Sequence, residues 1–146
     1  ALQVFFLYGV RPHELWECEV LDNCLLRVSD NTKTGLRVAM PREKQLVEKW
    51  DLFGTGHERL PQTFGRRAVH PEQCVSMEFN RVRLEAGIKY PAYAIRHAWA
   101  INSIKAVTNI RLAAKSLGHT VAEHESTYLN WITEKEMLDA MLKEVA

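Results

Sequence analysis

The chain has 146 residues, of which 47% are hydrophobic and 25% are charged. These values are ordinary for a soluble globular domain with a buried core, and they exclude a disordered chain or a collagen-like rod. The sequence contains no run of about 18 uncharged apolar residues, so no membrane-spanning helix is predicted. We expect a single domain over residues 1–146 and no association with a membrane.

The formal net charge is +1, but the charged residues are unevenly distributed along the chain. Residues 1–60 carry a net charge of −1, residues 61–120 carry +6 and the remaining residues carry −4. A basic middle segment is able to hold a polyanion on one face, although a solvated helix face has the same composition. The charge pattern therefore permits a nucleic-acid partner without requiring one.

Three cysteines, Cys18, Cys24 and Cys74, form an odd set whose spacing matches no zinc-binding pattern. Buried thiols in a reducing compartment are the favoured interpretation, and metal ligands are the alternative. We therefore expect a cytoplasmic protein.

The first part of the chain combines helical and strand-like segments. A helix reaches Tyr8, and Arg11–Leu15 suits the start of a second helix. Leu21–Val28 and Leu36–Met40 alternate enough to form strands, and the residues at 29–35 are typical of a turn. The sequence predicts a β-hairpin here.

The rest of the chain is predicted to be helical, apart from one loop. Arg42–Trp50 has helical periodicity, and residues 51–70 hold three glycines and one proline. Five further helices are predicted at Pro71–Ala86, Ile95–Val107, Asn109–Leu117, Ala122–Trp131 and Glu134–Val145. The fold class is therefore mostly α with a small antiparallel β-hairpin.

Four short segments contain the candidate catalytic residues. They are Gly9-Val10-Arg11-Pro12-His13-Glu14-Leu15, Thr32-Lys33-Thr34-Gly35, Tyr93-Ala94-Ile95-Arg96, and Leu117-Gly118-His119 followed nine residues later by Tyr128. In this order and spacing, residues 5–131 resemble the catalytic domain of the tyrosine recombinase (phage integrase) family. The resemblance implies the α+β fold of that catalytic domain.

The resemblance also implies metal-independent cleavage and rejoining of double-stranded DNA, without a cofactor, through a covalent 3′-phosphotyrosyl intermediate. Tyr128 would be the nucleophile, and Arg11 and Arg96 would each offer parallel N–H donors to phosphate oxygens. Lys33 would protonate the departing 5′ oxygen, and His119 would bind the phosphate or assist proton transfer.

Two features depart from the family pattern. The first position of its His-x-x-Arg box is Tyr93, whose phenol is able to donate a hydrogen bond to phosphate in place of an imidazole. The N-terminal domain that clamps DNA in this family has no counterpart in the sequence. Among neighbouring residues we expect Tyr8 and Trp131 to pack in the core, His97 to face elsewhere as a structural residue, and His124 to be exposed.

Other basic residues are candidates for contacts with the DNA backbone. They are Arg66 and Arg67 in the loop, and Arg81, Arg83 and Lys89 on or after the basic helix. A surface ion pair is the alternative for each arginine, and Arg11 is able to pair with Glu14. The C-terminal helix carries an apolar stripe that either packs on its own domain or docks on a neighbouring copy in a tetramer on DNA.

Two other functions are compatible with the same fold. One is a catalytically silent DNA-binding or accessory module, which the substitution at Tyr93 and the missing clamp favour. The other is a relaxing enzyme similar to the type IB topoisomerases, which share the tyrosine chemistry. The strand-transfer enzyme is the preferred prediction, with a location at the nucleoid.

Overall fold

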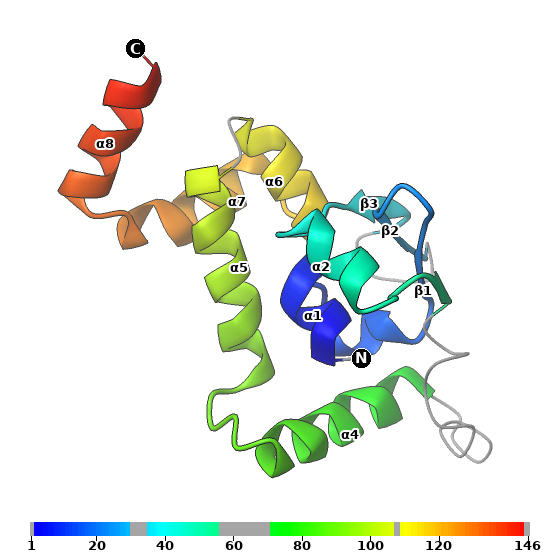
Figure 1. Ribbon diagram of the computed structural model, residues 1–146. Coiled ribbons are helices and arrows are strands. Elements are labelled where there is room, and N and C mark those ends of the chain that lie inside the picture. Colours follow the sequence, from blue (N-terminus) through cyan, green and yellow to red (C-terminus); the bar gives the residue numbers. More distant parts are fainter. Residues whose placement is uncertain (1, 30–34, 56–70, 107–108, 145–146) are drawn as a thin grey trace.

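The computed structural model describes residues 2–29, 35–55, 71–106 and 109–144 and is mostly helical (Figure 1). Its helical elements are α1 (Leu2–Tyr8), the 3-10 helix η1 (Pro12–Leu15), α2 (Lys44–Lys49), α4 (Pro71–Glu85), α5 (Ala92–Ala106), α6 (Ile110–Leu117), α7 (Val121–Tyr128), the 3-10 helix η2 (Leu129–Trp131) and α8 (Glu134–Glu144). A small antiparallel sheet accompanies them. The expected fold class is confirmed.

The sheet has the strand order β3-β2-β1-β4, and each neighbouring pair is antiparallel. Its strands are β1 (Cys18–Val20), β2 (Leu26–Val28), β3 (Arg37–Ala39) and β4 (Gly54–Thr55). The β2–β3 pairing matches the predicted hairpin, since Leu26 lies opposite Ala39 and Val28 opposite Arg37.

Two details of the predicted sheet are wrong. The chain turns within the expected strand Leu21–Val28, because Cys24 adopts a left-handed φ of 66° and the Asn23 side chain accepts the Leu25 amide. Residues before that turn pair instead as β1, which runs antiparallel to β2. The short strand β4 lies in the segment that was expected to be only a loop.

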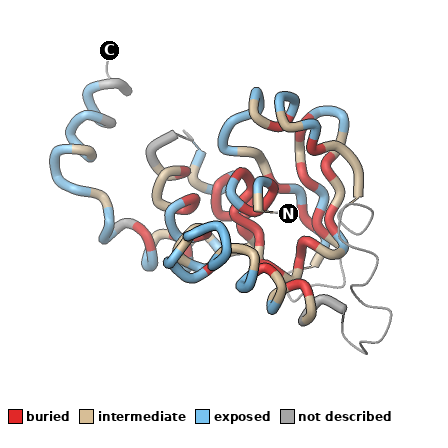
Figure 2. Tube along the Cα trace, turned by 60° about the horizontal axis from the view of Figure 1, so that its bottom comes forward, coloured by how far each residue is buried: buried red, intermediate tan, exposed pale blue. Residues whose placement is uncertain are grey.

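The core lies between α1, η1, the sheet and the start of α4 (Figure 2). Alternation along β1 and β2 buries Cys18, Val20, Leu26 and Val28 against α1. Tyr8 packs there as expected, and its hydroxyl donates a hydrogen bond of 2.7 Å to the carbonyl of Cys24. All three cysteines are free thiols; Cys18 and Cys24 are buried as predicted, whereas Cys74 is half-buried.

Gly9 allows α1 to approach α5 closely. Its φ of +62° lies in the left-handed region, and a Cβ atom added to it would stand 2.7 Å from Cγ of Trp99. Trp99 is buried, and its indole N–H donates a hydrogen bond of 2.7 Å to the carbonyl of Leu7. A side chain at position 9 would therefore separate the helix that carries Arg96 from the segment that carries Arg11.

We expect Gly9→Ala to lower the free energy of unfolding by about 2 to 4 kcal/mol, through backbone strain and the overlap with Trp99. Gly87→Ala is the matched control, because Gly87 also has a positive φ (+74°) but a Cβ atom added to it would meet nothing within 4 Å. The control is expected to cost only about 1 kcal/mol. Urea unfolding of both variants measures the difference, and equal losses would show that the contact with Trp99 is unimportant.

The C-terminal helix α8 projects away from the rest of the chain (Figure 1). Met137, Leu138, Met141 and Leu142 are all exposed, so this stripe does not pack on its own domain. Trp131, which was expected in the core, is 67% exposed because η2 already leads away from the body. Within the described ranges, no helix is long and apolar enough to cross a membrane.

Candidate active site

An open pocket of about 730 Å³ lies where η1, β3, α5 and the α6–α7 junction meet. Its lining holds three cationic residues (Arg11, Arg37 and Lys115) and one acidic residue (Glu123). The remaining lining residues are Leu36, His97, Gly118, His119, Thr120, Thr127 and Tyr128. A concave surface with this excess of positive charge suits an anionic ligand.

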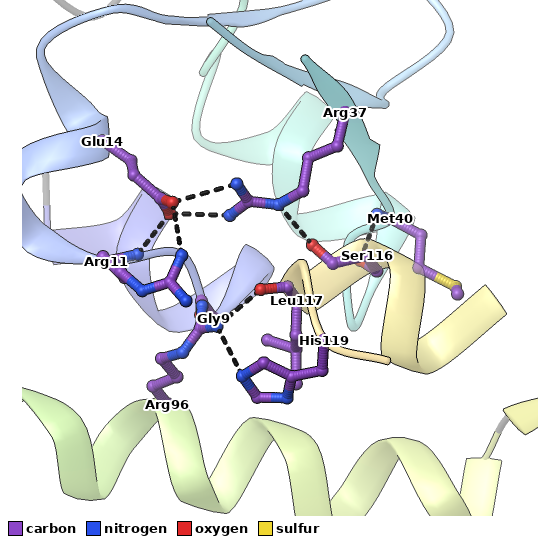
Figure 3. A network of polar contacts seen from close by, with 9 residues as sticks. All are labelled: Gly9, Arg11, Glu14, Arg37, Met40, Arg96, Ser116, Leu117 and His119. Atoms are coloured by element: carbon purple, nitrogen blue, oxygen red, sulfur yellow. Dashed lines mark hydrogen bonds and ion pairs between the residues drawn. The ribbon is translucent and has the colours of Figure 1, made fainter. Parts of the chain in front are cut away.

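Glu14 is the centre of a buried ionic network beside the pocket (Figure 3). Its carboxylate accepts bonds of 2.9 Å from Arg11 Nη1, and of 2.9 and 2.7 Å from the two terminal nitrogens of Arg37. It also accepts the backbone N–H of Arg11 at 2.7 Å. Burial by itself would raise the pKa of Glu14, but the bonds and charge of Arg37 and then Arg11 lower it to about 2.

Arg37 joins this network to α6. Its Nε donates a bond of 3.1 Å to the carbonyl of Ser116, and the Ser116 hydroxyl accepts the backbone N–H of Met40 at 2.9 Å. Arg37 is a site residue that no motif in the sequence indicated. The alternation of Leu36, Val38 and Met40 favours burial of the strand face that these three residues share. In the structure Leu36 and Val38 are exposed, and Arg37 on the other face is buried.

Arg96 connects α5 to two other segments from a buried position, with 2% of its surface exposed. Its terminal nitrogens donate bonds of 2.6 Å to the carbonyls of Gly9 and Leu117, and Nη2 lies 3.1 Å from His119 Nε2. Burial, followed by the charge of Arg11, lowers the pKa of Arg96 to about 10, so the guanidinium stays charged at neutral pH. Because a guanidinium only donates, His119 Nε2 accepts this bond.

The C-terminus of α6 places His119 in the pocket. Gly118 forms a left-handed C-cap of α6 with a φ of 69°, and the N–H of His119 bonds to the carbonyl of Ala114 at 2.9 Å. Burial and then the charge of Arg96 lower the pKa of His119 to about 4, so its imidazole is neutral at pH 7.

Helix α7 begins two residues after His119 and ends at Tyr128, and both residues line the pocket. A reciprocal pair of bonds between Thr120 and Glu123 caps its N-terminus. The rings of His119 and Tyr128 stack with centroids 6.1 Å apart and an interplanar angle of 16°. Tyr128 is only 2% exposed, and burial raises its pKa even though Arg96 and Arg11 act to lower it.

Two histidines differ from expectation. His97 does not face away from the site, because it lines the pocket and its Nδ1 lies 3.1 Å from the hydroxyl of Tyr128. His124 is fully buried instead of exposed, and its ring centroid lies 5.0 Å from that of Tyr128. Both lie beside Tyr128 because α7 packs against α5, but His97 stays exposed on the pocket surface whereas His124 is in the interior.

Two of the described site candidates, Arg96 and Tyr93, do not line the pocket, but Arg96 contacts the lining residue His119. Tyr93 has no such contact among the bonds that the structure describes. It lies one helical turn before Arg96 on α5 and is 50% exposed. The structure therefore brings together Arg11, Arg96, His119 and Tyr128, but not Tyr93. Lys33 lies outside the described residues.

The candidate DNA contacts that the structure describes, Arg81, Arg83 and Lys89, do not line this pocket. Arg81 forms ion pairs with Glu78 and Glu85 on the same exposed face of α4, which is the alternative considered for it. Arg83 donates a bond of 2.9 Å to the carbonyl of Ile88. Lys89 is exposed just after α4, which lies at the opposite end of α5 from α6 (Figure 1). Arg66 and Arg67 lie outside the described residues.

No metal centre accompanies the described part of the pocket. Across the ranges that the structure describes, no group of three or more His, Cys, Asp or Glu side chains is arranged to hold a metal ion.

Known proteins are similar to the chain both in sequence and in fold. The chain is 27% identical to excisase A and 30% identical to excisase C, both of Nostoc sp. strain PCC 7120, over 87% and 85% of its own length. It spans only 29% and 27% of those two relatives. The crystal structure of XerA recombinase matches 98% of the chain with a TM-score of 0.60 and 16% identity, over 56% of that recombinase. No protein-family model matches the chain.

The chain is thus related in sequence to recombination proteins and shares the fold of a recombinase. This agrees with the broad outline of the resemblance seen in the sequence.

Proposed function

We propose that the chain cleaves and rejoins double-stranded DNA without a metal ion, through a covalent bond between phosphate and Tyr128. The observation that carries the proposal is the convergence of Tyr128, His119 and Arg11 on one cationic pocket, with Arg96 buried against His119. Relatives named excisases and the fold of a recombinase support the same class of reaction.

The proposed reaction needs a nucleophile and positive groups around the phosphate. The Tyr128 oxygen attacks phosphorus, the bond to the 5′ oxygen breaks, and the new phosphotyrosyl bond conserves the energy needed for rejoining. Arg11 and Arg96 supply positive charge where negative charge develops on the phosphoryl oxygens. Their bonds to Glu14, Gly9 and Leu117 hold both guanidinium groups in place before DNA binds.

Covalent trapping tests this function. We would incubate the chain with a pool of nicked duplexes of randomised sequence, labelled at the 5′ end, and denature the mixture in detergent. The expected result is label attached to protein in the presence of EDTA, since a 3′-phosphotyrosyl bond retains the 5′ segment. A strict need for a divalent cation, attachment through the other strand end, or no adduct at saturating protein would refute the proposal.

One observation favours a catalytically silent DNA-binding module as the second candidate. The hydroxyl of Tyr128 is held by His97, and Glu14 is bonded to the Arg11 guanidinium, so both groups are engaged within the chain. Binding of the same DNA pool without any adduct would identify this alternative.

The proposal includes self-association on DNA. The exposed apolar stripe of α8 fits contact with a second copy, and a tetramer on two duplexes would couple four copies of the site. Location at the cytoplasmic nucleoid belongs to the same proposal.

A further inference from the structure

The hydroxyl of Tyr128 has one direct polar neighbour among the described residues, the imidazole of His97 on α5. The Nδ1 atom of His97 lies 3.1 Å from the Tyr128 oxygen, and the two rings are tilted by 55° with centroids 5.6 Å apart. Both side chains line the pocket. We propose that His97 accepts the hydroxyl proton of Tyr128 when its oxygen attacks a phosphodiester, a role that rests on the proposed function.

A buried tyrosine needs such a base. Because burial opposes ionisation of the Tyr128 phenol, the hydroxyl stays protonated at neutral pH and is a weak nucleophile until its proton is removed. An imidazole already in hydrogen-bond contact with that hydroxyl is suited to remove it in the transition state.

The other two imidazoles beside Tyr128 are less suited to this step. His119 uses Nε2 to accept from Arg96, and its ring is stacked on Tyr128 without a bond to the hydroxyl that the structure describes. His124 is fully buried, and neither of its ring nitrogens has a partner within the described residues. The side chain of His97 is exposed, so a proton that it accepts is able to pass to solvent.

Each bond that forms in the proposed step is matched by one that breaks. As the bond from the Tyr128 oxygen to phosphorus forms, the O–H proton moves to Nδ1 of His97, and the bond from phosphorus to the 5′ oxygen breaks. The departing 5′ oxygen takes a proton from a general acid other than His97, a role that the sequence resemblance implies for Lys33. Rejoining reverses these steps, and the imidazolium of His97 returns its proton to Tyr128. The other charged or titratable groups around the pocket and the two rings, among the described residues, are Arg11, Arg37, Arg96, Lys115, His119, Glu123 and His124.

The first test needs no DNA. Nitrogen-15 NMR of the histidine rings should show the neutral form of His97 as the tautomer with its proton on Nε2, with Nδ1 accepting the Tyr128 hydroxyl. In the Tyr128→Phe chain, the Nδ1 resonance should move toward that of a free acceptor nitrogen. Protonated Nδ1 that donates to the Tyr128 oxygen would overturn the proposal.

The second test measures the rate of adduct formation on the duplexes trapped from the randomised pool. His97→Gln and His97→Ala should each slow it by about 100-fold or more, the usual contribution of a positioned base. Free imidazole in the buffer should restore part of the rate to His97→Ala, but not to Tyr128→Phe. His13→Gln is the matched control, because His13 lies on η1 outside the pocket lining, and it should keep the native rate.

A substrate with sulfur in place of the bridging 5′ oxygen distinguishes the two proton-transfer roles. This sulfur leaves without being protonated, so the substrate needs a general base for Tyr128 but no general acid for the leaving group. The defect of His97→Gln should persist on this substrate. Recovery there would assign His97 to the leaving group and overturn the proposal, as would a native rate for His97→Gln on normal DNA. Absence of any adduct from the unaltered chain would instead refute the proposed function itself.

Discussion

The Tyr128→Phe chain is expected to bind DNA as tightly as the unaltered chain and to form no covalent adduct. The substitution removes one oxygen atom, which is the proposed nucleophile, and leaves the ring that stacks on His119. The bond to His97 is also lost, at a cost of about 1 kcal/mol in stability. Fluorescence anisotropy measures binding, and trapping on denaturing gels measures adducts.

Tyr90→Phe is the matched control, because it removes the same hydroxyl from a residue that is 74% exposed after α4. This variant should form adducts at the native rate. Persistence of the adduct in Tyr128→Phe would show that another side chain attacks the phosphate. Loss of the adduct in both variants would indicate a general effect on the protein.

The second large effect is expected for Glu14→Ala, which should lower the free energy of unfolding by about 3 to 5 kcal/mol. The substitution removes the carboxylate that accepts two bonds from the buried guanidinium of Arg37, and it removes an acceptor of the Arg11 guanidinium. Urea unfolding measures this loss. Glu19→Ala is the matched control, because Glu19 pairs with Arg27 on the surface and such pairs contribute at most about 1 kcal/mol.

The same carboxylate makes stability depend on pH. The pKa of Glu14 is about 2 in the folded chain, below its ordinary value of 4.5, so the folded state favours the ionised form. Its contribution is therefore complete above about pH 4.5 and is lost as the pH falls toward 2. The Glu14→Ala chain should lose less stability across this range than the unaltered chain.

A double substitution separates the charge effect from simple loss of packing. Glu14→Met combined with Arg37→Met removes both buried charges and should recover much of the stability lost in Glu14→Ala. Equal losses in Glu14→Ala and Glu19→Ala would contradict a structural role for the network.

Local patterns in the sequence were sufficient for most elements. The helices after residue 70 follow from periodicity, although α5 begins at Ala92 instead of the predicted Ile95 and α7 ends at Tyr128 instead of the predicted Trp131. The helix predicted at Ala122–Trp131 corresponds to α7, which begins after His119 and ends at Tyr128. The pairing of β2 with β3 followed from alternation around a turn.

The tertiary structure decided which face of each helix or strand is buried, and the local sequence pattern could not predict this. Alternation shows which residues of β3 share a face, but contact with α6 and Glu14 determines that the face with Arg37 is the buried one. His97 and Tyr128 are 31 residues apart, and only the packing of α5 against α7 brings them into contact. The sequence by itself therefore determined the local elements and the candidate residues in their order. Their partners depend on long-range packing, because a side chain's neighbours come from segments that are distant along the chain.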